Sequence, residues 1–194
     1  MNTSREHIIA NIRKNKPRSI DLPEIPLFNQ DRLDLIGRFE FAVVQTGGHI
    51  FHGNLSDLSN EIEERFQSVE KILVGPSLST DVSNSSFNEA MLPHELDDLD
   101  LMIVRSDIGV AENGAVWVDD NHLGHRAQPF ITKHLLIIIE KENIVCNMHE
   151  AYDRVRLKEI GYGVFIAGPS KTADIEKTLV IGAQGALSYH VMLI

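Results

Sequence analysis

Residues 135–139 read Leu-Leu-Ile-Ile-Ile, an uninterrupted apolar run that lacks the polar alternation of a half-exposed strand. Such a run is typical of a strand that is covered on both faces, as the strands of parallel sheets are. The sequence therefore predicts a central, largely parallel sheet with this run inside it. Other short apolar runs predict further strands over residues 41–44, 72–74, 100–104, 114–118, 163–167 and 189–194.

Apolar residues at helical spacing separate several of these runs. Leu58, Ile62 and Phe66, for example, share one face of a helix. Strands that alternate with helices are typical of the α/β class, in which helices cover both faces of the sheet. On this basis we expect helices over residues 32–41, 55–67, 146–160 and 172–181.

The length and composition indicate one globular domain with an N-terminal extension. The 194 residues are 43% hydrophobic and 24% charged, as expected of a folded chain. Residues 4–15 predict a short amphipathic helix, and residues 17–26 contain three prolines and no periodicity, which indicates an extended connector. We therefore expect a helix and connector over residues 1–31 and a single α/β domain over residues 32–194.

The charge of the chain is unevenly distributed. The net charge of −10 disfavours binding to a nucleic acid, because it repels the phosphate backbone. The first 21 residues nevertheless carry five basic and two acidic side chains, a net charge of +3. This basic arm is either a solvated helix or a segment that docks on an acidic surface.

Cysteine content and hydropathy favour a cytoplasmic protein. Cys146 is the only cysteine, so the chain cannot form an intrachain disulfide or an iron–sulfur cluster of its own, and we expect Cys146 to be a packing residue. No apolar stretch approaches the roughly 20 residues of a membrane span, and the first residues lack the apolar region of a secretion signal. We expect no metal site, because the closest histidine pair, His122 and His125, lacks supporting ligands.

The segment Gly168-Pro169-Ser170-Lys171-Thr172-Ala173-Asp174-Ile175-Glu176 follows an apolar run and precedes a helical pattern. A strand that leads through a tight turn into a helix points free backbone N–H groups at one place, where an anion can bind. Ser170, Lys171 and Thr172 would add side-chain donors. The spacing matches neither a Walker loop nor a dinucleotide fingerprint. The candidate anion-binding residues are Gly168, Ser170, Lys171, Thr172 and Asp174.

The same segment also has a purely structural interpretation. Ser170 or Thr172 would then only cap the helix, and Asp174 would stabilise the first helical turn. In either case the loop of residues 182–188 would follow the far end of that helix. We therefore expect this loop to lie away from the anion.

A second candidate is the turn that presents Glu112 between two predicted strands. A carboxylate at a strand end can act as a base or a nucleophile, and Asp107 and Asn113 are expected beside it. The alternative is a hairpin in which Asn113-Gly114 supplies the required positive φ and Glu112 is merely exposed. The candidate catalytic residues are thus Glu112, Asp107 and Asn113.

Together these motifs resemble the lactate utilization protein C family, whose defining region is called the LUD domain. The Gly-Pro-Ser-Arg-Thr-Ala-Asp-Ile-Glu string of that family is matched by residues 168–176, with a difference only at Lys171. Its Ala-Glu-Thr-Gly string is matched by residues 111–114, with Asn113 in place of threonine. The resemblance extends over approximately residues 37–194 and is weaker at Ala115, Gln184 and Ala186.

The resemblance implies a fold like that of ribose-phosphate isomerases, sugar-phosphate deaminases and CoA transferases. It also implies a bacterial system that oxidises L-lactate to pyruvate with iron–sulfur partner proteins, in which this chain binds no cofactor itself and handles a partner or a small anionic ligand. Glu112-Asn113-Gly114 resembles the Glu-x-Gly turn that carries the nucleophile of some CoA transferases. An independent enzyme acting through Glu112 on an acyl-CoA or a sugar phosphate, and a pure assembly module, are the alternatives.

Overall fold

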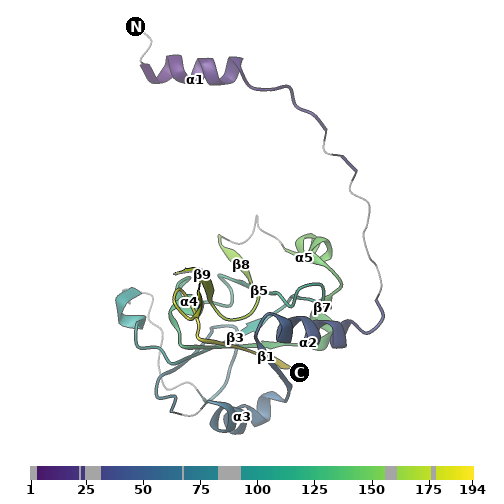
Figure 1. Cartoon of the computed structure of the whole chain (residues 1–194), viewed down its shortest axis with the longest axis vertical. Helices are drawn as coiled ribbons and strands as arrows, with labels where there is room; N and C mark the ends of the chain where they lie inside the picture. Colours follow the sequence, from purple (N-terminus) through teal and green to yellow (C-terminus); the bar gives the residue numbers. More distant parts are fainter. Residues whose placement is uncertain are drawn as a thin grey trace.

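A computed structural model describes residues 4–21, 23–24, 32–66, 68–82, 93–155, 161–175 and 178–194. A parallel sheet at its centre has the strand order β1-β11-β6-β3-β2 (Figure 1). The expected central parallel sheet is thereby confirmed. Its strands are β1 (His49–His52), β2 (Ile72–Val74), β3 (Leu101–Ser106), β6 (His134–Ile139) and β11 (Ser188–Leu193).

The apolar run of residues 135–139 forms most of β6, the middle strand of this sheet. Its side chains alternate between two apolar clusters, so that Leu135 and Ile137 face one side and Leu136 and Ile138 face the other. Helix α2 (Leu35–Gln45) packs on the first side, and α3 (Leu58–Arg65) packs on the second. The sheet therefore has a helix on each face, as Figure 1 shows.

A second, four-stranded sheet lies on the α2 side of the central sheet, with the strand order β7-β4-β5-β8. Helix α5 (Met148–Arg154) packs against its outer side through Ala151, which lies beside Trp117 and Val145. The strands are β4 (Gly109–Val110), β5 (Val116–Asp119), β7 (Ile144–Val145) and β8 (Gly163–Ile166). Short helical segments complete this part: η1 (Leu55–Asp57), η2 (Pro93–Leu96), α4 (Gln128–Ile131) and η3 (Lys141–Asn143).

The strand predicted over residues 41–44 is wrong, because these residues continue α2. Phe39 and Val43, one helical turn apart, are fully buried against the sheet, whereas Phe41 and Val44 are exposed. A continuous apolar run does not by itself distinguish a strand from a helix, and here the burial pattern has the helical period. The strand β1 that follows α2 was not predicted.

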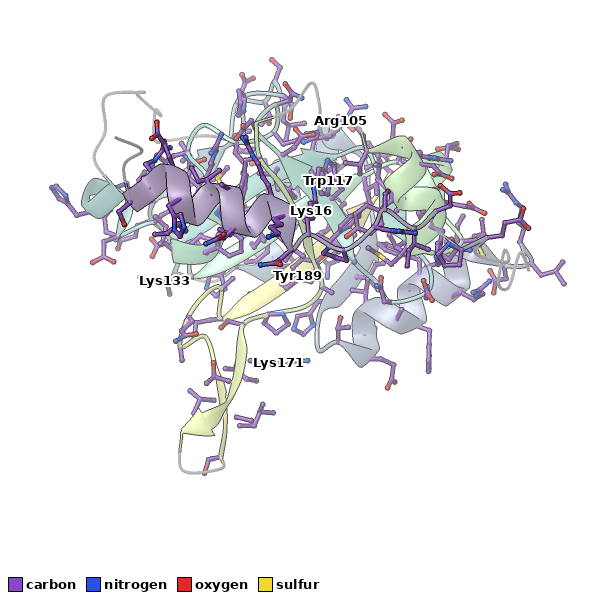
Figure 2. All side chains as sticks on the ribbon, turned by 90° about the horizontal axis from the view of Figure 1, so that it is seen from above. Lys16, Arg105, Trp117, Lys133, Lys171 and Tyr189 are labelled. Atoms are coloured by element: carbon purple, nitrogen blue, oxygen red, sulfur yellow. The ribbon has the colours of Figure 1, made fainter. Side chains whose placement is uncertain are left out.

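The helix predicted over residues 172–181 is also wrong. Strand β9 (Lys171–Ile175) pairs antiparallel with β10 (Thr178–Ile181), and the resulting hairpin projects from the body in Figure 2, with Lys171 at its base. Many of its residues are β-branched, which favours strands over helices. The helix predicted over residues 146–160 is shorter in the structure, where it corresponds to α5, and residues 156–160 lie outside the described residues.

Helix α1 (Ser4–Lys14) forms as expected and has no buried residue. Its apolar side chains Ile8 and Ile12 are 55% and 65% exposed. Figure 1 shows α1 set apart from the two sheets. Within the part of the chain that the structure describes, none of the helices is both long enough and apolar enough to serve as a membrane span.

Candidate functional site

The segment that was expected to bind an anion joins β8 to β9 instead of starting a helix. Gly168 has a φ of +78°, and a Cβ at this position would collide with the carbonyl oxygen of Thr46. The Lys171 ammonium donates a hydrogen bond to that same carbonyl oxygen. The segment thus fastens the start of the hairpin to the turn after α2. The expectation of a helix N-terminus at this place is wrong, since Thr172 and Asp174 lie on β9.

The loop of residues 182–188 lies next to Ser170, and not away from it as expected. The Ser170 N–H donates to the Ala186 carbonyl (3.0 Å), and the Gly182 N–H donates to the Ser170 carbonyl (2.9 Å). The Gln184 N–H also reaches Ser170 Oγ (3.3 Å). The reason is topological: a hairpin returns the chain to its starting point, whereas a helix would have carried it away.

The Glu112 turn connects β4 to β5. Gly114 adopts a φ of +70° there, and a Cβ would lie 2.7 Å from the backbone nitrogen of Val43 on α2. The exposed Glu112 accepts a hydrogen bond from the Met148 N–H at the start of α5 (Oε2 to N, 3.0 Å). Asn113 Oδ1 accepts from the Ala115 N–H (3.0 Å), as is common in tight turns.

Glu112 and Asn113 line a pocket of about 540 Å³ between this turn and α2. Arg38 and Thr46 contribute to its wall. Asp107 is not among the lining residues. Its 64% exposed carboxylate lies 3.2 Å from His122 Nε2, while His122 Nδ1 is 3.0 Å from Asp119. The structure therefore brings Glu112 and Asn113 together and places Asp107 with the buried His122.

A larger cleft, of about 860 Å³, was not predicted from the sequence. We call it the histidine cleft. It lies where the amino ends of β1, β6 and β11 meet, so that His49, His134 and Ser188 begin adjacent parallel strands. The register pairs His49 with His190 and Ser188 with His134. Its polar lining residues are His49, Glu64, Arg65, His134, Ser188 and His190.

Ser188 lies between two imidazoles in this cleft. Its Oγ is 2.7 Å from His134 Nδ1 and 3.0 Å from His190 Nε2. The His49 ring stacks on the His190 ring, with 4.7 Å between the ring centroids, and Phe66 packs edge-on against His190. His190 is 9% exposed, and its Nδ1 atom has no hydrogen-bond partner among the described residues.

Burial disfavours the charged form of both imidazoles. Burial, assisted by the nearby His49, His134 and Arg65, lowers the pKa of His190 to about 3. Burial also lowers the pKa of His134, although the Asp100 carboxylate opposes this shift. Arg65 donates through Nε to Glu61 (2.8 Å), and its guanidinium lies 4.0 Å from the centroid of the Phe51 ring. The cleft therefore combines the Arg65 cation and the Glu64 carboxylate with two imidazoles whose charged form is disfavoured by burial.

The sequence contains no local signal for this cleft, because its histidines come from three distant segments. One clue is that a polar residue begins each of three strands in one parallel sheet, since the strand starts of such a sheet lie along one edge. His49 beside Gly48 also allows a ring near a pocket, although an ordinary polar loop residue is the commoner interpretation. Cys146, by contrast, is buried as a packing residue, as expected. No cluster of three or more potential metal ligands occurs in the described ranges.

Comparisons with known proteins point in one direction. A family model described as the LUD domain matches residues 33–194. The lactate utilization protein C of Anoxybacillus flavithermus is 36% identical over 90 residues, which is 46% of this chain and 41% of that protein. The corresponding protein of Bacillus subtilis is 32% identical over 99 residues, covering 47% and 41% of the two chains. The matched stretch thus spans about two fifths of each relative.

One solved structure is also similar to this chain. It is the crystal structure of a DUF162 family protein from Deinococcus radiodurans, which has a TM-score of 0.67 and 18% sequence identity. The similarity covers 85% of this chain and 99% of that chain. At this level of identity the comparison supports the mixed α/β fold described above.

Proposed function

The chain belongs to the LUD domain family, and on that premise we propose that it is a component of a cytoplasmic L-lactate utilization system. It supports the oxidation of lactate to pyruvate together with iron–sulfur partner proteins. The observation that carries this proposal is the similarity to several proteins named lactate utilization protein C. With Cys146 as its only cysteine, the chain cannot supply the thiolates of an iron–sulfur cluster, so the partners hold the redox centres.

Within this proposal, the histidine cleft receives the small anionic ligand. Arg65 is a cation for a carboxylate, and His134 with Ser188 can exchange a hydrogen bond with a hydroxyl group. Lys171 lies against Gly47, which lines the cleft, and adds positive charge beside it. A 2-hydroxy acid contains both groups that these side chains recognise.

The experiment is reconstitution with purified proteins. The full chain and its iron–sulfur partners are assayed, separately and together, for lactate-dependent reduction of a dye. We expect oxidation only when all components are present, and a loss of at least tenfold with His134→Gln. His52→Gln is the matched control, because His52 is exposed and pairs with Glu40 outside the cleft. Equal lactate oxidation by the partners alone would contradict the proposal.

A second candidate function is an independent transferase or isomerase-like enzyme that acts through Glu112 on an acyl-CoA or a sugar phosphate. The observation that favours it is the pocket that Glu112 and Asn113 share with Arg38. In the transferase version, a carboxylate oxygen of Glu112 attacks the thioester carbonyl and the CoA thiolate leaves. The fold resemblance to CoA transferases, which the sequence motif implies, also supports this candidate.

This candidate is tested by a screen of acyl-CoA esters and sugar phosphates against the purified chain. Mass spectrometry after incubation with acyl-CoA should show an acylated peptide that contains Glu112, and Glu112→Gln should abolish it. The control is Glu63→Gln, a change of an exposed carboxylate on α3. Turnover that survives Glu112→Gln would exclude this role for Glu112.

A further inference from the structure

Ser188 Oγ lies within hydrogen-bond distance of both His134 and His190, an arrangement that ligand binding alone does not require. A serine hydroxyl has one proton, so it can donate to only one of the two imidazoles and must accept from the other. Donation to His134 makes His190 Nε2–H the donor to Ser188, which leaves a lone pair at the buried His190 Nδ1. The reverse assignment would leave a buried N–H at Nδ1 without a partner, and orphaned donors are the rarer case.

The favoured assignment directs the Ser188 proton toward His134 Nδ1 at 2.7 Å. This is the arrangement of a serine with its general base, and His190 fixes the oxygen from the other side. Ser188 lines the open cleft, so a substrate can approach its oxygen. Arg65 and His49 line the same cleft and offer further N–H groups.

We propose that Ser188 is the nucleophile of an acyl-transfer activity in the histidine cleft, with His134 as general base, acting on a small ester or thioester. This activity is a different reaction from the proposed role in lactate utilization, although it uses the same cleft, and it does not use Glu112. Labelling of Ser188 is read out without lactate or partner proteins, so it can succeed or fail independently of that role. His190 is a positioning residue, because it contacts Ser188 and not the reacting carbonyl.

The reaction balances with water as the second substrate. A bond forms between Ser188 Oγ and the acyl carbon while the serine proton moves to His134 Nδ1. Arg65 and His49, which line the same cleft, are the candidate donors to the oxyanion, and the bond to the alcohol or thiol then breaks as His134 returns the proton to that leaving group. Water attacks the acyl-serine in the same way. The products are a carboxylic acid, the alcohol or thiol, and free Ser188.

The test uses a fluorophosphonate probe on the purified full chain. Ser188 Oγ should form a bond to phosphorus, with loss of fluoride, and peptide mapping should place the adduct on Ser188. Because a general base contributes roughly a hundredfold or more, His134→Gln should slow labelling by about that factor. Ser56→Ala, a change of an exposed serine on η1, should label like the wild type.

The pH dependence of labelling shows whether His134 acts as a general base or only packs beside Ser188. The groups around His134 are Asp100, Lys133, Ser188 and the imidazole of His190. Because burial lowers the pKa of His134, the labelling rate should stay constant from pH 8 to below the usual histidine range and fall only in more acidic solution. This acid limb should disappear in His134→Gln.

Two results would overturn the proposal. One is the absence of an adduct on Ser188 in the folded wild-type chain, and the other is labelling of His134→Gln at the wild-type rate. Ser188→Cys provides a second measurement that keeps a hydrogen-bonding side chain beside His190. Its thiol should react with iodoacetamide more slowly once His134→Gln is added, whereas the buried Cys146 should not react. A thiol reactivity independent of His134 would also contradict the proposed base.

Discussion

Asp100 is the residue that most clearly ties separate segments of the central sheet together. It precedes β3, and its Oδ2 accepts hydrogen bonds from the N–H groups of Glu70 (2.9 Å) and Lys71 (3.0 Å). Its Oδ1 accepts from the Lys133 ammonium at 2.6 Å, just before β6. The bond from Lys133, followed by those from the backbone, lowers the pKa of Asp100 from 3.8 to about 2.

Replacement of Asp100 by asparagine should therefore make stability less dependent on pH. A carboxylate with a depressed pKa stabilises the folded state above its ordinary pKa of 3.8, and this contribution is lost as the pH falls toward 2. Allowing for solvent screening, the loss at pH 7 should be about 1–2 kcal/mol. Urea unfolding at pH 7 and at pH 2 measures it, and the difference between the two proteins should be much smaller at pH 2. Asp98→Asn, a change of an exposed carboxylate, should have little effect.

Gly168 shows why a residue can matter without being part of a ligand site. Its positive φ and its contact with Thr46 leave no room for a side chain. Gly168→Ala should destabilise the chain by about 1–3 kcal/mol, because it combines backbone strain with a collision against backbone. The control is Gly161→Ala, where a Cβ would approach only the ends of the flexible Arg126 and Asp120 side chains. Equal unfolding midpoints for the two variants would show that Gly168 does not fasten the hairpin.

At the scale of elements, four of the five strands of the central sheet (β2, β3, β6 and β11) were predictable because their core residues are apolar on both faces, whereas the half-exposed β1 was not. No tertiary information was needed to predict the strands over residues 135–139 and 72–74, because a strand buried on both sides of a sheet has a continuous apolar run. The strand prediction for residues 41–44 was wrong for a related reason, since a helix packed on a sheet can have an equally apolar stretch. The β9–β10 hairpin was predicted as a helix because Thr172 and Asp174 also fit the first turn of a helix. In the structure the two strands pair with each other instead.

Two residues of the stretch 41–44 give a direct test of the corrected element. Val43 is fully buried, whereas Phe41 is 67% exposed. In a strand these two residues would share one face, but in a helix they lie on nearly opposite sides. Val43→Ala should cost about 2 kcal/mol of unfolding free energy by emptying part of the core, and Phe41→Ala should cost less than about 1 kcal/mol. Similar losses in urea unfolding would argue against the helix.

At the scale of the molecule, the turn after α2 lies between the two candidate pockets. Thr46 lines the Glu112 pocket, while Gly47 and Gly48 line the histidine cleft. The Glu112 turn could be found from sequence, because it is a local motif of adjacent residues. The histidine cleft could not, because His49, His134 and His190 meet only through the parallel order β1-β11-β6. Strand order is set by packing across the whole sheet, which no local pattern records.

The basic N-terminal arm should contribute little to the stability of the folded chain. Residues 4–21 carry no buried side chain, and only Ile9 is partly covered. Removal of residues 1–21 therefore removes almost no buried apolar surface from the folded chain, and the burial of such surface is the main stabilising term. The melting temperature should change by less than about 2 °C, because in a chain of this size each kcal/mol corresponds to about 2–4 °C.

Circular dichroism against temperature measures the effect of this truncation, with the full chain as reference. A drop of more than about 5 °C would mean that the arm packs on the body and that residues 1–31 are not separate from the domain. Salt gives an independent check, since the arm has a net charge of +3 and the remainder has −13. If the arm were held on the body by this attraction, the full chain would lose stability between 0.05 and 0.5 M salt, because screening weakens exposed charge pairs, whereas the truncated chain would not. We expect the two chains to respond to salt alike, because α1 has its apolar face, Ile8 and Ile12, in solvent and no buried residue through which to bind.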